Sequence, residues 1–237
     1  MRILASIKQE NVIAFKEAFL DNGNNDNKQP QVNSQPFLWL VIEYADGYDL
    51  YQKICQKQTE NEYFTEGEVW QVLIHALRGL KELHDLRIMH RDLKSANIFF
   101  SKDGIAKLGD MNVSKTIDSN GLNYTQTGTP YYASPEVWKD EPYDIKSDIW
   151  SLGWVIYEMW ALKPPFRART MDDLFKKVSH GIYARIPKVF SNDLSSVIRL
   201  LLQTNPSKRP TWDKLLNSII IQEKVSYYSI IFLDQEI

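Results

Sequence analysis

The chain has 237 residues, of which 43% are hydrophobic and 24% charged, and its net charge is −2. This composition is typical of a globular protein of one or two domains, and the small net charge argues against a polycation that binds nucleic acid. Cys55 is the only cysteine, which excludes an intrachain disulfide, and no apolar run is long enough to span a bilayer. We therefore expect a soluble intracellular protein.

Two strands are predicted near the N-terminus, on either side of a polar loop. Residues 12–20 alternate short apolar groups with polar ones, which suggests the first strand. Residues 21–36 are rich in Asn and Gln, and their single apolar residue is Val32. Such a segment buries too little surface to offset its ordering entropy, so we expect a mobile loop. Residues 37–44 (FLWLVIEY) form a compact apolar run, which predicts a buried strand.

A mainly helical body is predicted after residue 45. The clearest helix covers residues 65–86, because Thr65 and Glu68 form a capping-box pattern ahead of apolar residues at helical spacing. Residues 148–162 are apolar on nearly every side, which predicts a helix buried in a larger core. Further helices are predicted over residues 174–180, 194–203 and 212–221, and short strands over residues 98–100 and 105–108.

The most informative segment is HRDLKSAN, residues 90–97, which matches the pattern H-R-D-L-x-x-x-N of a phosphotransferase catalytic loop. A carboxylate at Asp92 can accept the proton of a substrate hydroxyl, and the amide oxygen of Asn97 can bind a hard cation such as Mg²⁺. A surface ion cluster is the alternative, but the register of Leu93 and Asn97 makes it the weaker one. Asp110 follows thirteen residues after Asn97 and provides a carboxylate as the second metal ligand.

Three later segments complete an ordered series of motifs. They are GTPYYASPE at residues 128–136, DIWSLG at residues 148–153, and Arg209-Pro210. With these segments the chain resembles a eukaryotic serine/threonine protein kinase over residues 2–220, and it resembles the NIMA-related (Nek) family most closely. Asp110 then occupies the place of the Asp in the kinase motif Asp-Phe-Gly, which reads Asp-Met-Asn here.

The resemblance implies an α+β protein-kinase fold. Its N-terminal lobe would be incomplete, with the end of helix C and strands 4 and 5, and its C-terminal lobe would be largely complete and mainly helical. Residues 1–44 would be the remnant of the N-terminal lobe, residues 45–222 the C-terminal lobe, and residues 223–237 an atypical tail. No glycine-rich loop, strand lysine or helix glutamate of a kinase is found in the sequence. We therefore expect the chain as written to bind ATP weakly and to transfer phosphate slowly.

The resemblance also implies catalytic and metal-binding roles. Asp92 would be the catalytic base, and Lys94 would contact the γ-phosphate of ATP and mark serine/threonine specificity. Asn97 and Asp110 would hold Mg²⁺. Thr129 would help to seat the acceptor hydroxyl of the substrate.

An adenine site is implied at the end of the second strand. Ile42 would be the gatekeeper residue, and the backbones of Glu43 and Ala45 would hydrogen-bond adenine. Phe99 would form the floor beneath the adenine ring.

Other residues would order and anchor these sites. Thr125 matches an activating phosphorylation site, with Thr127 as a second candidate, and a phosphate there would pair with Arg91. Glu136 would pair with Arg209, and Asp148 would anchor the backbone of the catalytic loop. No chemical role is expected for His75, His84 or His180.

The leading functional prediction is a protein serine/threonine kinase that uses ATP and Mg²⁺ and acts on protein substrates. The alternative is a non-catalytic pseudokinase or scaffold built on the C-terminal lobe. The abrupt start of the chain inside an expected helix favours an incomplete, N-terminally truncated form of a normal kinase. Intact Asp92, Asn97 and Asp110 argue against a genuine pseudokinase. We expect no nucleic-acid or membrane partner, and a cytoplasmic location with cytoskeletal or ciliary association by analogy. The oligomeric state stays open.

Overall fold

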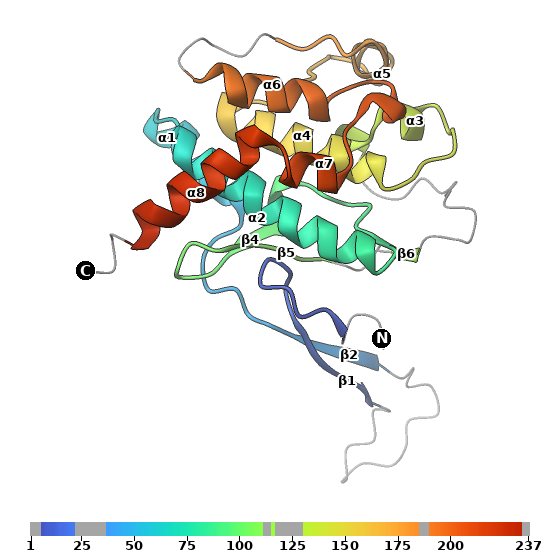
Figure 1. Ribbon diagram of the computed structural model, residues 1–237. Coiled ribbons are helices and arrows are strands. Elements are labelled where there is room, and N and C mark those ends of the chain that lie inside the picture. Colours follow the sequence, from blue (N-terminus) through green and yellow to red (C-terminus); the bar gives the residue numbers. More distant parts are fainter. Residues whose placement is uncertain (1–5, 22–36, 111–114, 117–129, 185–189, 234–237) are drawn as a thin grey trace, which may run out of the picture.

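The computed structural model describes residues 6–21, 37–110, 115–116, 130–184 and 190–233 (Figure 1). Its strands are β1 (Phe15–Asp21), β2 (Phe37–Ile42), β3 (Ile88–Met89), β4 (Ile98–Phe100), β5 (Ala106–Leu108) and β6 (Lys115–Thr116). Its helices are α1 (Leu50–Glu60), α2 (Glu66–Asp85), α3 (Pro135–Trp138), α4 (Lys146–Ala161), α5 (Met171–His180), α6 (Asn192–Leu201), α7 (Trp212–Leu216) and α8 (Ile219–Leu233). A hairpin therefore precedes a mainly helical body, as the sequence predicts.

Helix α4 forms the centre of the helical body, packed against α2 and α6. Its buried residues point in every direction around the helix axis, which confirms the prediction of a helix enclosed by the core. Trp150 and Trp154 both pack on Phe166, with ring centroids 5.6 and 5.2 Å apart. A Cβ atom on Gly153 would lie 2.7 Å from the Cβ of Leu201, so the close approach of α6 requires glycine at this position.

Helix α2 begins where the capping-box pattern predicts. Thr65 is its N-cap, and the side chain of Glu68 accepts a hydrogen bond from the backbone N–H of Thr65 at 2.7 Å. The Thr65 hydroxyl accepts a bond from the backbone N–H of Glu68 in return. The helix ends at Asp85, and β3 follows after a short turn.

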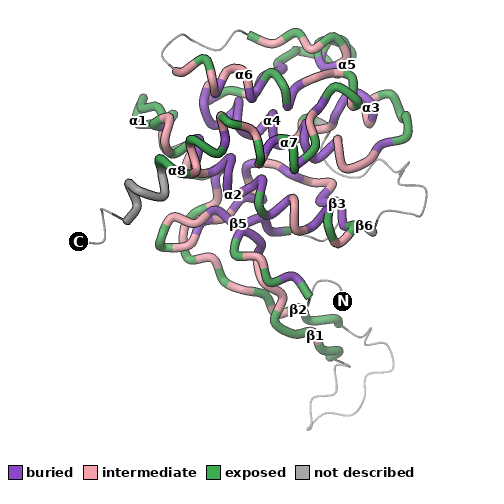
Figure 2. Tube along the Cα trace, viewed as in Figure 1, coloured by how far each residue is buried: buried purple, intermediate pink, exposed green. Residues whose placement is uncertain are grey.

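The β1–β2 hairpin corrects the prediction of a buried strand. β2 pairs antiparallel with β1, but five of its six side chains are exposed, Trp39 by 53% and Phe37 by 65%. Figure 2 shows the hairpin extending away from the helical body, with most of its surface exposed. An apolar run indicates a strand but does not reveal what covers it, and the described residues place no layer over this sheet. The Asn-rich loop lies, apart from Asp21, outside the described residues.

Two small sheets hold the loops that carry the motifs. β4 pairs with β5, with Ile98 opposite Leu108, and β3 pairs with β6. Both are antiparallel, and the β4–β5 sheet packs on α2. The predicted strands at residues 98–100 and 105–108 are thus confirmed within one residue.

The C-terminal residues form two helices where one was predicted. Asn217 ends α7, and α8 runs from Ile219 to Leu233, across the expected boundary at residue 222. α8 packs against α2, and Ile221 is fully buried. None of the helices in the described part of the chain is long and apolar enough to cross a membrane.

Candidate active site

The loop between β3 and β4 carries the HRDLKSAN segment, and buried Asp148 of α4 holds its backbone. Asp148 accepts hydrogen bonds from the backbone N–H of His90 and of Arg91, both at 2.9 Å. Arg91 has a positive φ of 68°, a strained conformation for this residue type that these bonds help to maintain. The expectation that Asp148 anchors the catalytic loop is confirmed.

His84 of α2 supports Asp148 from the other side. Its Nε2 lies 2.7 Å from Oδ2 of Asp148, while its Nδ1 accepts a hydrogen bond from the indole N–H of Trp212. Because Trp212 can only donate, His84 carries its proton on Nε2 and donates it to Asp148. Burial raises the pKa of Asp148, but the hydrogen bonds from His84 and from the backbone N–H of Arg91 lower it more, so the pKa lies below its ordinary value and the carboxylate stays ionised. The sequence analysis missed this positioning role, since a single helical His has no distinguishing pattern.

Two polar side chains of the loop, those of Lys94 and Asn97, converge on Asp92. The Lys94 ammonium lies 2.7 Å from Oδ2 of Asp92, and the Asn97 amide nitrogen donates to the Asp92 backbone carbonyl at 2.8 Å. The same amide lies 3.2 Å from Oδ2 of Asp92. Asp92 and Lys94 remain partly exposed, at 16% and 26%, so a substrate can reach them. These contacts bring together the residues assigned to proton transfer and to phosphate contact.

Asn97 and Asp110 carry oxygen atoms of the kind that Mg²⁺ binds. The Asn97 side-chain nitrogen is used by Asp92, which leaves its oxygen Oδ1 for a cation. The backbone N–H of Gly109 donates to the carbonyl of Asn97 at 3.0 Å. This bond brings the backbone just before Asp110, which is exposed, next to Asn97. Mg²⁺ prefers such oxygen ligands and keeps several waters, so one amide and one carboxylate suffice. The described residues contain no cluster of three or more His, Cys, Asp or Glu side chains that could hold a metal.

The predicted adenine site lies beside β4. A Cβ atom on Gly109 would lie 2.7 Å from the Phe99 ring and 3.1 Å from the side chain of Ile13, so these groups pack closely. Asp49 forms a bridge to Phe99, and the backbone N–H of Gly47 donates to the Phe100 carbonyl, which fixes the segment after β2 along β4. The segment that follows the residues assigned to adenine therefore runs along the strand that bears Phe99, and the adenine site stays a prediction.

Both the backbone N–H and the carboxylate of Glu43 have hydrogen-bond partners in the same region. Its backbone N–H donates to the Ala14 carbonyl at 2.7 Å, and its carboxylate accepts from the Ala14 N–H at 3.0 Å and from the Lys107 ammonium at 2.8 Å. An adenine contact from Glu43 therefore has to come from its carbonyl. Ala45 is half-buried, and its role stays a prediction.

A second buried network joins the catalytic loop to α4, and the sequence analysis missed it. The Tyr132 hydroxyl lies 3.1 Å from Ser95 Oγ and donates to a Glu158 carboxylate oxygen at 2.8 Å. Burial raises the pKa of Glu158 more than its hydrogen bonds lower it. The network fixes residues 130–132 against the loop that bears Asp92.

The expected pair of Glu136 and Arg209 is confirmed. It is bidentate, with nitrogen–oxygen distances of 2.6 and 2.7 Å, and both side chains are buried. Arg209 also donates to the carbonyls of Gln203 and Lys146, so its charge and its donors are satisfied. The pair connects α3 to the segment before α7.

Several sequence predictions fall outside the described residues. They concern Met111, Asn112, Thr125, Thr127 and Thr129. Arg91, the expected partner of a phosphate on Thr125, donates to the Tyr143 hydroxyl at 2.8 Å.

Comparison with known proteins agrees with this geometry. Residues 1–220 match the protein kinase domain family. The chain is 38% identical over 215 residues to serine/threonine-protein kinase Nek3 and 39% identical over 226 residues to serine/threonine-protein kinase Nek5, both from Mus musculus. It is 32% identical over 247 residues to the G2-specific protein kinase nimA of Emericella nidulans.

These alignments cover 90%, 94% and 93% of this chain, but only 39%, 34% and 34% of the respective relatives. The chain thus spans less than half the length of these relatives. The family match and the loop that Asp148 anchors lead to the same conclusion: the chain belongs to the protein kinase domain family and is related to the Nek serine/threonine kinases.

Proposed function

We propose that this protein transfers the γ-phosphate of ATP to serine or threonine hydroxyls of protein substrates. The observation that carries the proposal is the cluster of Asp92, Lys94 and Asn97, held on a backbone that buried Asp148 anchors. The kinase family match supports the reaction class, and the Nek relatives support serine/threonine specificity. A kinase of this family implies the use of ATP and Mg²⁺ and the binding of protein substrates.

Each residue of the cluster has a distinct task in the proposed reaction. Asp92 accepts the proton of the substrate hydroxyl and aligns its oxygen, and Lys94 offsets negative charge on the transferred group. Asn97 and Asp110 would hold Mg²⁺, which would neutralise charge on the phosphates. Phe99 and the backbone of Glu43 and Ala45 would place adenine so that the γ-phosphate reaches Asp92.

The kinetic test of this proposal compares Asp92→Asn with the wild type. Loss of the base lowers kcat by about 10²- to 10⁴-fold and leaves the KM for ATP nearly unchanged, because Asp92 acts on the hydroxyl. Transfer of labelled phosphate to a mixture of serine- and threonine-containing peptides measures both constants, in the 237-residue chain and in the complete reading frame. The matched control is Asp103→Asn, in the exposed turn between β4 and β5, which keeps wild-type rates. Equal rates for Asp92→Asn and the wild type would rule out the assigned base.

A binding test separates a kinase from a non-catalytic scaffold. Mg·ATP should raise the melting temperature of the wild-type chain, since a ligand that binds only the folded state stabilises it. Asp110→Asn should remove most of this shift, and ATP with EDTA should give little of it. If Mg·ATP does not raise the melting temperature of the wild type above that of Asp110→Asn, the scaffold alternative gains support.

We also propose a cytoplasmic location. The single cysteine supports a reducing compartment. Imaging of the tagged full-length protein tests this, and it also tests the cytoskeletal or ciliary association expected by analogy. A secreted product would contradict it.

A further inference from the structure

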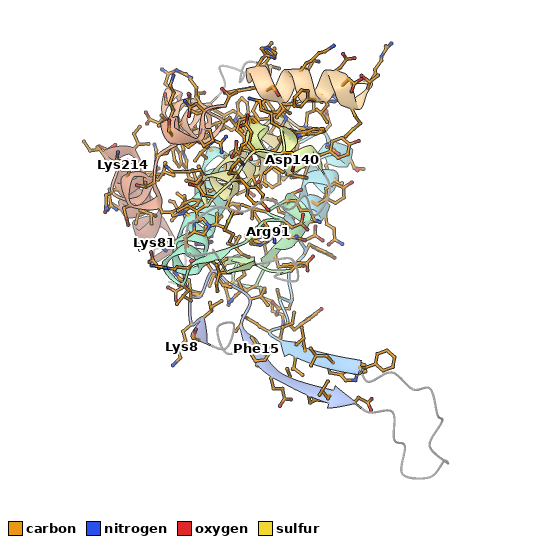
Figure 3. All side chains as sticks on the ribbon, turned by 90° about the vertical axis from the view of Figure 1, so that its right-hand side faces the viewer. Lys8, Phe15, Lys81, Arg91, Asp140 and Lys214 are labelled. Carbon is orange, nitrogen blue, oxygen red and sulfur yellow. The ribbon has the colours of Figure 1, made fainter. Side chains whose placement is uncertain are left out.

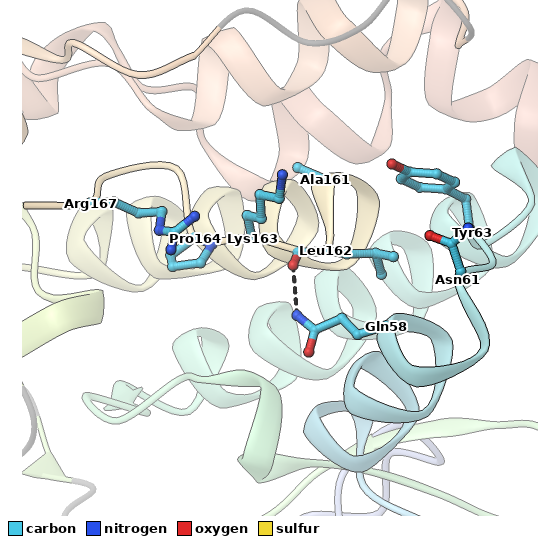
Figure 4. A pocket seen from close by; sticks show the side chains of 8 residues that line it. All are labelled: Gln58, Asn61, Tyr63, Ala161, Leu162, Lys163, Pro164 and Arg167. Atoms are coloured by element: carbon cyan, nitrogen blue, oxygen red, sulfur yellow. Dashed lines mark hydrogen bonds between the residues drawn. The ribbon is translucent and has the colours of Figure 1, made fainter.

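A groove with basic walls lies at the C-terminal end of α4, between α1 and α5. Two adjoining hollows form it, of about 410 and 650 Å³, and Arg167 lines both. Figure 4 shows the residues that line the smaller one. We call it the basic groove and define it by its five basic side chains. These are Lys163, Arg167, Arg169, Lys176 and Lys177.

Hydrogen bonds from two directions hold the groove in shape. The side-chain nitrogen of Gln58, on α1, donates to the carbonyl of Leu162 at 2.7 Å, which fixes α1 to the end of α4 (Figure 4). The Lys177 ammonium, on α5, donates to the carbonyl of Arg167 at 2.7 Å, which fixes the intervening loop to α5. Hydrogen bonds to backbone carbonyls therefore fix the walls of the groove. The exposed guanidinium groups of Arg167 and Arg169 take no part in them.

The charge of this segment differs from that of the whole chain. Residues 163–177 carry five basic and two acidic side chains, a net charge of +3, whereas the whole chain has −2. The acidic pair is Asp172 and Asp173, in the first turn of α5, where the helix dipole favours them. Asp173 lies 3.9 Å from the Lys176 ammonium, so it offsets one of the five positive charges only in part.

Three of the basic groups have no protein partner within the described residues. The structure records no ion pair and no side-chain hydrogen bond there for Lys163, Arg167 or Arg169, and all three are exposed. Single exposed lysines and arginines are ordinary, because water solvates them well. Five positive charges around one groove repel one another and create a local positive potential, which favours an anionic ligand. The guanidinium fork matches a carboxylate in particular.

The basic groove is connected to the candidate active site through α4. Leu162, which lines the groove, comes four residues after Glu158, a distance of about one helical turn or 6 Å. Glu158 accepts a hydrogen bond from Tyr132, whose hydroxyl lies 3.1 Å from Oγ of Ser95 in the catalytic loop. A hydrogen-bonded network thus links the catalytic loop that bears Asp92 to the end of α4 that lines the groove.

We propose that the basic groove binds an acidic segment of the protein substrate, rich in Asp or Glu, outside the residue that accepts phosphate. Its role in substrate selection rests on the proposed kinase function, but the binding itself does not. Carboxylates of the segment pair with Arg167, Arg169 and the lysines of α5. Pro164, beside Arg167, and Tyr63, on the side of the groove away from Arg167, offer contact for an apolar side chain that flanks the acidic residues (Figure 4).

The binding test uses the 237-residue chain and requires no catalysis. A short fluorescein-labelled peptide of Glu residues flanked by Leu and Pro is titrated by fluorescence anisotropy, next to the same peptide with Gln for Glu. The double variant Arg167→Gln/Arg169→Gln should raise the Kd of the Glu peptide about tenfold, as expected for the loss of two exposed ion pairs. The matched control is Arg78→Gln/Arg199→Gln, which removes the same charge from exposed sites on α2 and α6 and should leave the Kd unchanged.

Three results would overturn the proposal. They are equal affinity for the Glu and Gln peptides, an equal loss of affinity in both double variants, and no binding of the Glu peptide at low salt. Phosphatidylglycerol vesicles and a single-stranded oligonucleotide serve as other anions. If either binds through Arg167 and Arg169 while the Glu peptide does not, the groove is assigned to that ligand instead.

A kinetic arm separates this proposal from the proposed function. In a catalytically active form, Arg167→Gln/Arg169→Gln should raise the KM for an acidic substrate about tenfold and leave kcat unchanged. If Asp92→Asn shows that no phosphotransfer occurs, the kinase function fails while the binding result still stands. If phosphotransfer occurs but the peptide binds elsewhere, only the proposal for the groove fails.

Discussion

Asp148 organises the candidate site at the scale of single residues. One buried carboxylate receives two backbone N–H groups of the catalytic loop and the imidazole of His84. Charge-assisted hydrogen bonds of this kind are about twice as strong as neutral ones, so they can hold the strained φ of Arg91. The position of Asp92 therefore depends on residues that never touch the substrate. Figure 3 places Arg91 in the lower part of the helical body, above the hairpin that bears Phe15.

The first prediction concerns Trp212, whose indole N–H fixes the tautomer of His84. Trp212→Phe keeps an aromatic ring but leaves buried Nδ1 of His84 without its donor, which costs about 1–3 kcal/mol in the free energy of unfolding. Urea denaturation measures the loss, and the ¹⁵N shifts of His84 should show that its proton is no longer confined to Nε2.

Trp160→Phe is the matched control for this prediction. Trp160 is as deeply buried, but its indole nitrogen has no hydrogen-bond partner within the described residues, so the change removes packing and no hydrogen bond. If Trp212→Phe and Trp160→Phe destabilise the protein equally, the hydrogen bond to His84 contributes nothing.

The sequence predicts a helix well where it contains a clear start signal or a clear pattern of apolar residues. Helix α2 combines a capping box with an apolar stripe, and α4 is apolar on all sides, so both were predicted with boundaries within two residues. The bounds of helix α1 were not predicted, because most of its side chains are polar or charged and only Leu50 and Ile54 are buried. Helices at the surface with a narrow apolar face resemble loops in sequence.

The second prediction tests the start of α2. Thr65→Ala removes the side-chain oxygen that accepts the N–H of Glu68, and it should lower the free energy of unfolding by about 1 kcal/mol. Thermal or urea unfolding provides the measurement. Thr65→Ser keeps the oxygen and should restore most of the stability, so equal losses for Ala and Ser would argue against the cap.

The buried pair of Glu136 and Arg209 acts at the scale of the whole molecule, since it joins segments 73 residues apart. Burial raises the pKa of Glu136, but the hydrogen bond and charge of Arg209 lower it more, so the net pKa lies below the ordinary value of 4.5. A carboxyl with a lowered folded-state pKa stabilises the fold above its unfolded pKa. That contribution is lost as the pH falls through the folded pKa.

The third prediction therefore concerns acid stability. Glu136→Gln keeps the shape but leaves the buried Arg209 charge unpaired, which should cost about 3–5 kcal/mol at pH 7. The wild type should lose stability below about pH 4.5, whereas the variant should show a flatter dependence there. Urea unfolding between pH 7 and pH 3 measures both curves. Parallel curves for the two proteins would contradict the assigned role.

The kinase family, the main helices and the chemistry of the loop around Asp92 follow from the amino-acid sequence alone, because ordered motifs and local periodicity lie within short stretches of the chain. Three other features emerge only once the chain is folded. They are the exposure of β2, the support that His84 and Trp212 give to Asp148, and the five basic side chains around one groove. These features depend on which distant segments meet. Burial and tautomers follow from that packing, and no local pattern encodes them. The basic charge lies within residues 163–177, but the groove that it lines exists only because α1 meets the end of α4.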